Sequence, residues 1–257
     1  SNISTQIVNG VLTNQGTIPS TSPAAILKGA TALDPEESFN FTVGVYANLF
    51  DVFDITLDYF NINVEDRLSL SSEFALTDAD RASLTGQGID ASDISEFRFF
   101  TNQFETDTAG IDLVATAESE WLNGITTWNL AFNWTDTDVA SRNAALFNDG
   151  RVRLVEDGTP GTRWNLTANH NIGQWRLLAR LNFYGEYYDN EAGGNFDDAT
   201  LIDLEAAYDI TEDMSITIGG TNVGDEQGCS TANCGTTPPG ALGLPYSQVT
   251  PVGLPGA

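Results

Sequence analysis

The stretch Trp128-Asn129-Leu130-Ala131-Phe132-Asn133-Trp134-Thr135 decides the fold class of this chain. Large apolar side chains occupy its even positions, and small or polar side chains occupy its odd positions. Successive side chains of a β-strand point to opposite faces, so a period of two predicts a strand with one apolar face and one polar face. A helix would instead bring together residues three and four positions apart.

The same alternation recurs along most of the chain. Its apolar positions fall within residues 39–45, 53–59, 111–117, 128–134, 164–168, 175–183, 202–208 and 214–218. Most of these segments exceed the usual globular strand of about 5–6 residues, and a tilted strand needs roughly 9–11 residues to cross a bilayer. The pattern therefore predicts an all-β fold, an antiparallel up-and-down meander of about eight long strands that forms part of a transmembrane β-barrel.

The links between these strands alternate in length. Short turns are expected at 48–52, 119–124, 173–174 and 211–213, and long polar links at 72–96, 138–161, 189–199 and 227–257. Outer-membrane barrels have short periplasmic turns and long external loops, so this order favours a barrel over a soluble sandwich. Within 72–96, Thr77 and Asp80 predict one capped helical turn. We expect one barrel region over 1–257, with an irregular segment at 1–32, hairpins at 33–226 and an external loop at 227–257.

Charged side chains fall on the polar face of the predicted strands. A charge at the hydrocarbon midplane costs about 2–4 kcal/mol for Arg or Lys, so these groups are expected to face the barrel lumen, with Arg176 and Arg180 balancing acids on neighbouring strands. The predicted lumen-facing residues are Asp54, Asp58, Asp112, Glu118, Arg176, Arg180, Glu186, Asp203 and Glu205.

Aromatic residues fall near the predicted strand ends. Trp175 follows a short turn, whereas Trp134, Trp164 and Tyr187 lie toward long links. Tryptophan and tyrosine gather at both interfaces of a membrane, so we interpret these four as members of two aromatic girdles. Packing in the core of a soluble sandwich is the alternative interpretation.

The composition excludes one large class of partner. The chain has 36 acidic and 10 basic side chains, a net charge of -26, and Lys28 is its only lysine. Duplex affinity depends on neutralising phosphates with Lys and Arg, so nucleic-acid binding is excluded. The acidic residues are interpreted as solvated loops, or alternatively as a field that attracts cations.

Few residue types that carry chemistry are present. Cys229 and Cys234 suggest a short loop disulfide in an oxidising compartment, with two free thiols as the alternative. His170 is the only histidine, which excludes a Ser-His-Asp triad and a paired-histidine metal site. We therefore assign no catalytic, cofactor-binding or metal residues and expect neither an enzyme nor a bound cofactor.

Particular motifs resemble one known family. Leu33-Asp34-Pro35-Glu36-Glu37-Ser38-Phe39-Asn40, the run 99–113 with Thr108-Ala109-Gly110-Ile111-Asp112-Leu113, and Ile218-Gly219-Gly220-Thr221-Asn222-Val223-Gly224-Asp225 resemble barrel segments of TonB-dependent receptors. The resemblance covers about residues 30–226 and depends on the order and spacing of the pieces. One departure is Asn222-Val223-Gly224-Asp225, where family members usually have Asn-Leu-Phe-Asp.

The resemblance implies a receptor or transporter in the outer membrane of a Gram-negative bacterium. Its expected partners are outer-membrane lipid, a small-molecule or metal-chelate ligand held by the loops, and the TonB complex acting through a plug domain. The chain is expected to be a barrel fragment that lacks the plug and the last strand. Two alternatives remain: a self-contained eight-stranded structural barrel of the OmpA type, and a secreted soluble β-sandwich that binds ligands.

Overall fold

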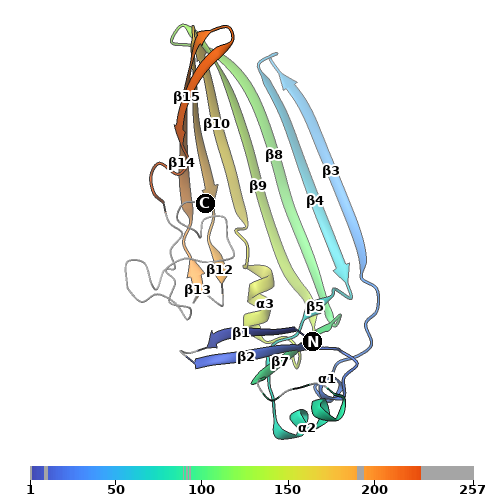
Figure 1. The fold of residues 1–257 in the computed structure, drawn as a ribbon. Helices are drawn as coiled ribbons and strands as arrows, with labels where there is room; N and C mark the ends of the chain where they lie inside the picture. Colours follow the sequence, from blue (N-terminus) through green and yellow to red (C-terminus); the bar gives the residue numbers. More distant parts are fainter. Residues whose placement is uncertain are drawn as a thin grey trace.

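One long antiparallel sheet dominates the computed structural model, which describes residues 2–8, 11–88, 90, 92, 94–189 and 194–226 (Figure 1). Its strands pair in the order β15-β14-β11-β10-β9-β8-β4-β3, so each long strand lies beside the next long strand along the chain. This confirms the predicted up-and-down meander. The strands are β3 (Glu37–Leu49), β4 (Phe53–Glu65), β8 (Phe104–Trp121), β9 (Gly124–Arg142), β10 (Thr162–Ile172), β11 (Trp175–Tyr184), β14 (Ala199–Thr211) and β15 (Met214–Gly220).

The predicted short turns all lie at one end of the sheet, the upper end in Figure 1. Two or three residues suffice for each turn, and in three of the four turns one or two of these residues adopt positive φ. Leu122 and Asn123, between β8 and β9, have φ of 47° and 60°, and Gly173, between β10 and β11, has φ of 57°. Turns of this kind match the right-handed twist of the strands that they join. The long links all leave from the opposite end.

The sheet is open in the part of the chain that the structure describes. β15 and β3 stand at opposite ends of the strand order, and no pairing joins them among those residues. An open edge in lipid leaves backbone groups unsatisfied at several kcal/mol each. Within the described residues the sheet therefore does not close on itself, as the alternative of a self-contained eight-stranded barrel requires.

The long-link end carries a folded cap. A second sheet has the order β1-β2-β7-β5, with β6 also paired to β7, and two helices lie beside it. The elements are β1 (Asn2–Val8), β2 (Val11–Ile18), α1 (Pro23–Leu27), β5 (Ser69–Leu70), β6 (Phe74–Ala75), α2 (Asp78–Gly86) and β7 (Glu96–Thr101). The capped helix predicted near Thr77 is confirmed as α2, and it is longer than the single turn expected.

The expectation of an irregular segment at 1–32 is wrong, because this segment forms β1, β2 and α1. The physical reason is tertiary. β2 pairs in parallel with β7, where Gln15 lies opposite Glu96 and Ile18 opposite Phe99. The partner strand β7 lies far along the chain, so this pairing has no local signal, but β2 also pairs with β1, and Asn9-Gly10 between them in the sequence is a hairpin signal that sequence reasoning missed.

The cap has its own hydrophobic core. Phe97, Phe99 and Leu84 are fully buried, and the Phe74 ring stacks on Phe99 with 5.7 Å between centroids. The remaining members of this core are Ile18, Ala24, Ala25, Ala30, Ile94, Phe104, Leu146 and Phe147. These residues come from the segment before β3, from the β4–β8 link with the start of β8, and from the β9–β10 link, so burial of their apolar surface holds these segments together as one unit.

Two smaller pieces complete the long-link end. α3 (Asp149–Glu156) follows β9, and β12 (Tyr187–Asp189) pairs with β13 (Gly194–Phe196) in a short hairpin. None of the helices in the described residues is long and apolar enough to cross a membrane.

Candidate functional site

The eight-stranded sheet presents a continuous apolar face. The backbone register aligns apolar side chains of neighbouring strands into rows that run across the sheet. One such row consists of Ile55, Ala115, Leu130, Leu166, Leu181 and Ile202. Many large side chains on this face are exposed, among them Val45, Leu204 and Ile218 at 63%, 47% and 75%. An exposed apolar surface of this extent marks a contact with lipid or with another protein.

Two of the predicted girdle tryptophans lie toward the long-link end of this face, and one lies at the short-turn end. Trp134 is the last large apolar side chain that β9 contributes to this face. Trp164 on β10 stacks on Phe183 with 5.3 Å between ring centroids. Trp175, the first residue of β11, contacts Tyr208 at 4.8 Å. Their positions agree with two girdles at the membrane interfaces, which stays a prediction.

Tyr187 is placed differently from the sequence-based expectation. It lies in the β12–β13 hairpin, is 4% exposed, and stacks on Phe196 with 4.8 Å between ring centroids. A side chain buried in this hairpin has no open surface for lipid, because the chain leaves the eight-stranded sheet at Tyr184. Sequence reasoning also missed Trp121, which ends β8 beside a short turn and is 58% exposed. Its place directly before the turn was the available signal.

The opposite, polar face holds eight of the nine predicted charged residues. Asp58 lies opposite Asp112 on the neighbouring strand, and Arg180 lies opposite Asp203. The other members lie an even number of residues from one of these four on the same strand, so they point to the same face: Asp54, Glu118, Arg176 and Glu205. Glu186 lies beyond the end of β11, in the link that leads to β12. The alternation in sequence therefore assigns the sides of the sheet correctly. That the polar face lines a lumen remains a proposal.

Arginines on the polar face balance acids on the neighbouring strand, as predicted. From β11, Arg176 Nη2 lies 3.2 Å from Asp209 Oδ1, and Arg180 Nη1 lies 4.0 Å from Asp203 Oδ2, both on β14. Asn182 Nδ2 also donates to Asp203 Oδ2 at 3.0 Å. Exposed ion pairs contribute little to stability, about 0–1 kcal/mol. Their main effect is to fix the acids against the sheet.

Asp203 also anchors the segment after β15, which sequence reasoning did not find. The backbone N–H of Asn222 donates to Asp203 Oδ1 at 2.9 Å, and Asn222 adopts a positive φ of 46°. The side chain of Asn222 then bonds twice with Glu226, accepting from its N–H at 2.9 Å and donating to its carbonyl at 2.8 Å. The family-like motif at 218–226 is thus a turn held against β14.

One stretch of β4 departs from the simple alternation. Near the long-link end, Phe60, Ile62 and Val64 lie on the polar face, on the same side as Asp58. The Phe60 ring fits there because Gly110 on β8 has no side chain: a Cβ at Gly110 would come within 2.3 Å of Phe60 Cζ and 2.6 Å of the Trp134 carbonyl oxygen. The glycine is therefore required by close packing.

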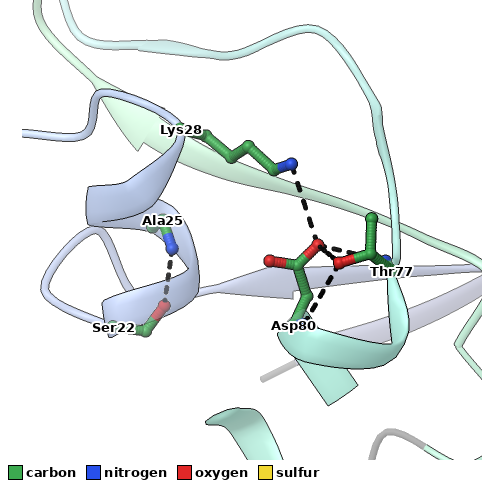
Figure 2. Close-up of polar contacts among 5 residues, drawn as sticks. All are labelled: Ser22, Ala25, Lys28, Thr77 and Asp80. Atoms are coloured by element: carbon green, nitrogen blue, oxygen red, sulfur yellow. Dashed lines mark hydrogen bonds and ion pairs between the residues drawn. The ribbon is translucent and has the colours of Figure 1, made fainter. Parts of the chain in front are cut away.

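The two cap helices meet through the only lysine of the chain (Figure 2). Lys28 Nζ, directly after α1, lies 3.7 Å from Asp80 Oδ2 in the first turn of α2. Asp80 forms a capping box with Thr77, whose N–H and hydroxyl donate to Oδ2 at 3.0 and 2.6 Å, while Thr77 Oγ1 accepts from the Asp80 N–H at 3.2 Å. Ser22 caps α1 in a similar way through Ala25 N–H at 3.2 Å.

This contact network changes the acidity of Asp80. Burial raises the pKa of the carboxyl, but the hydrogen bonds from Thr77 and the charge of Lys28 outweigh burial, so the pKa lies below its ordinary value of 3.8. The ionised carboxylate is thereby favoured at neutral pH. The cap is held together by this buried charge as well as by its apolar core.

The side chains suited to binding a metal ion or to redox chemistry are those of His, Cys, Asp and Glu. Within the described residues, no three His, Cys, Asp or Glu side chains come together in a way that could hold a metal ion. Cys229 and Cys234 lie outside the described residues, as does the external loop expected at 227–257. His170 lies near the end of β10 beside a short turn, as predicted, and its Nδ1 is 2.8 Å from Thr126 Oγ1.

The comparisons with known proteins agree with this two-faced sheet. The profile of the family described as "TonB dependent receptor-like, beta-barrel" matches residues 3–223. The chain belongs to this family. Barrels of TonB-dependent receptors lie in the outer membrane of Gram-negative bacteria, so we place the apolar face against lipid. Among curated protein sequences, none matches the chain.

Solved structures share the fold at low sequence identity. The ferripyoverdine receptor of Pseudomonas aeruginosa has a TM-score of 0.50 and 16% identity, over 78% of this chain and 25% of its own. The ferric yersiniabactin uptake receptor FyuA of Yersinia pestis has 0.52 and 16%, over 76% and 26%. The outer membrane transporter YddB of Escherichia coli has 0.53 and 10%, over 79% and 31%. The chain thus spans about a quarter to a third of the length of these receptors.

Proposed function

We propose that this chain forms part of the barrel of a receptor that takes up a scarce ligand across the outer membrane by TonB-dependent transport. The observation that carries the proposal is the open, two-faced, eight-stranded sheet, which matches the family along most of its length. An open sheet with one lipid-compatible face and one charged face needs further strands to close a barrel around an aqueous interior. Such an interior can hold a plug domain through which TonB acts.

The folded cap supports ligand capture on the external side. It extends from the long-link end, which faces outward in barrels of this kind. Its apolar core and the Lys28–Asp80 contact give the cap a defined shape without a ligand. We propose that the ligand, a small molecule or metal chelate such as a siderophore, cobalamin or saccharide, first binds to this cap. No covalent change of the ligand is expected.

Uptake measured in cells tests the proposal. A strain lacking the protein, and the same strain complemented with its gene, would be given radiolabelled ferric siderophores, cobalamin and oligosaccharides. Each ligand would be tested with and without a protonophore. We expect one ligand class to accumulate only in the complemented strain, only with the proton-motive force intact, and with unchanged mass. The proposal would be contradicted if, in cells starved for each nutrient in turn, every ligand class accumulated equally in both strains.

A cap variant makes the test specific for this chain. Lys28→Glu places two acids together at the α1–α2 contact and is expected to reduce ligand capture. The matched control is Arg81→Glu on α2, which makes the same charge change on the same cap at a residue outside the capping box. Equal loss of uptake in both variants would indicate a general charge effect and not a role of the α1–α2 contact.

A further inference from the structure

The apolar face contains an open hollow, which we name the alanine hollow. Its floor is formed by Ala168, Ala179, Ala206 and Gly220, on four adjacent strands, and its volume is about 630 Å³. The register places Ala168 opposite Ala179, and Leu204 between Ala179 and Gly220. Small side chains on neighbouring strands leave the sheet backbone open at this place.

Large apolar side chains form the rim of the hollow. Trp121 and Trp128 bound it on the side of β8 and β9, and Leu177, Leu204 and Ile218 border it on the other strands. These rim residues are 36–75% exposed, so the hollow opens outward from the apolar face. It belongs to the short-turn half of the sheet, since Trp121 is the last residue of β8 before the turn to β9. Short turns of such barrels face the periplasm.

A buried polar side chain also lines the hollow. His170 is 9% exposed, and its ring lies edge-on to Trp121 with 5.9 Å between centroids. Its Nδ1 is satisfied by Thr126, but its Nε2 is buried without a hydrogen-bond partner among the residues that the structure describes. An unsatisfied polar group next to hydrocarbon costs several kcal/mol. The hollow therefore combines an apolar floor with the polar side chains of Thr126 and His170 at its short-turn end, and Glu205 also lines it.

We propose that the alanine hollow binds one acyl chain of a phospholipid from the periplasmic leaflet, with the glycerol ester and head group beside His170. The aromatic side chains Trp121 and Trp175 mark the level of the head groups, as Trp does in membrane proteins generally. One leaflet of hydrocarbon is about 15 Å deep, so a chain that starts at this level passes directly over the floor.

A lipid chain fits this site better than a second protein. Lipid surrounds the apolar face at high concentration, and apolar surfaces have no hydrophobic driving force to leave lipid for one another. A flexible chain can fill an irregular hollow, whereas two barrels meet only if their surfaces are complementary. The inference depends on the membrane placement of the sheet and not on the proposed transport, so the two can fail separately.

Photo-crosslinking of the unmodified protein tests the site directly. The protein, in the outer membrane or in vesicles, would be given a phosphatidylethanolamine with a diazirine in one acyl chain, and labelled peptides would be mapped by mass spectrometry. We expect labelling of residues 164–181 and 200–208 to exceed that of residues 111–117, on the same face but outside the hollow, by several fold. Uniform labelling along the apolar face would overturn the proposal.

Filling the hollow provides the second measurement. Ala179→Leu with Ala206→Leu occupies the floor, and native mass spectrometry of the purified protein would count retained phospholipids. We expect one retained lipid in the wild type and about ten-fold less retention in the variant, because the added side chains overlap the bound chain. The control is Ala115→Leu, which adds the same group to the same face between Ile55 and Leu130 and should keep the lipid.

Two results would contradict the proposal. Equal lipid retention in all three proteins would mean that the hollow is ordinary lipid-exposed surface. A wild-type dimer that the double variant converts to a monomer would assign the hollow to a second copy of the chain.

Discussion

Substitution of Leu130 by Arg tests the assignment of the two faces. Leu130 lies on β9, two residues from Phe132 on the apolar face, and it pairs with Ala115 and Leu166 on the adjacent strands. All of its neighbours across the sheet are apolar. If this face contacts hydrocarbon, the guanidinium introduced by Leu130→Arg has neither water nor an acidic side chain beside it in the row of residues that crosses the sheet at this position.

The expected loss of stability follows from the depth of this position. Arg on the lipid face of a barrel costs about 2–4 kcal/mol at the midplane and about 0–1 kcal/mol near the interfaces. Leu130 lies between the level of Trp175 at the short-turn end and the level of Trp134 toward the long-link end, so we use the midplane value. A change of about 2–4 kcal/mol lowers the folding equilibrium constant by roughly 30- to 900-fold. Asn129→Arg is the matched control, since Asn129 lies on the polar face beside Thr116 and Thr167.

The assay is equilibrium unfolding in lipid vesicles with guanidinium, followed by tryptophan fluorescence. We expect the midpoint to fall strongly for Leu130→Arg and little for Asn129→Arg. Nitroxide labels at Leu130 and Leu204 should contact lipid-soluble oxygen, whereas labels at Asn129 and Glu205 should contact a water-soluble relaxer. Stronger destabilisation by the Asn129 variant, or a reversed accessibility pattern, would refute the assignment of the faces.

Three further outcomes follow from local contacts. Asp80→Asn removes the carboxylate of the capping box. Because the folded pKa of Asp80 is lowered, the wild-type contribution is present above pH 3.8 and is lost as pH falls through the folded pKa, so the protection factors of the α2 amides, corrected for the intrinsic pH dependence of exchange, should fall with pH in this range in the wild type and not in the variant. Gly110→Ala should destabilise the sheet by about 1–3 kcal/mol in thermal unfolding, because its Cβ meets a backbone oxygen at 2.6 Å. Gly86→Ala should cause no destabilisation, because a Cβ there meets nothing within 4 Å. Equal effects of the two substitutions would contradict the packing argument. Phe97→Ala should destabilise the cap by about 3–5 kcal/mol and speed amide exchange in β7 while β9 stays protected; uniform loss of protection would show that cap and sheet unfold together.

The difference between predicted and observed elements has a clear physical pattern. Elements with local signals were predicted, such as β9 from its alternation and α2 from Thr77 and Asp80. The parallel pairing of β2 with β7, far along the chain, had no local signal, whereas the pairing of β2 with β1 had one in Asn9-Gly10, which was missed. The side of the sheet on which the polar residues lie was predicted wherever apolar and polar residues alternate. The predicted alternation ends at Tyr59 and does not cover Phe60 on β4, whose place on the polar face depends on the space that Gly110 provides on another strand.

The sequence by itself determined the strand class, the order of the sheet, the short turns and the two faces of the sheet. These features depend on side-chain alternation and on neighbouring segments, which are local properties. Only the tertiary structure decided that β1, β2 and α1 join the cap, that Tyr187 is buried in a hairpin, and that Ala168, Ala179, Ala206 and Gly220 form one hollow. Each of these depends on which residues of separate strands come opposite one another, and that register is set by pairing across the sheet.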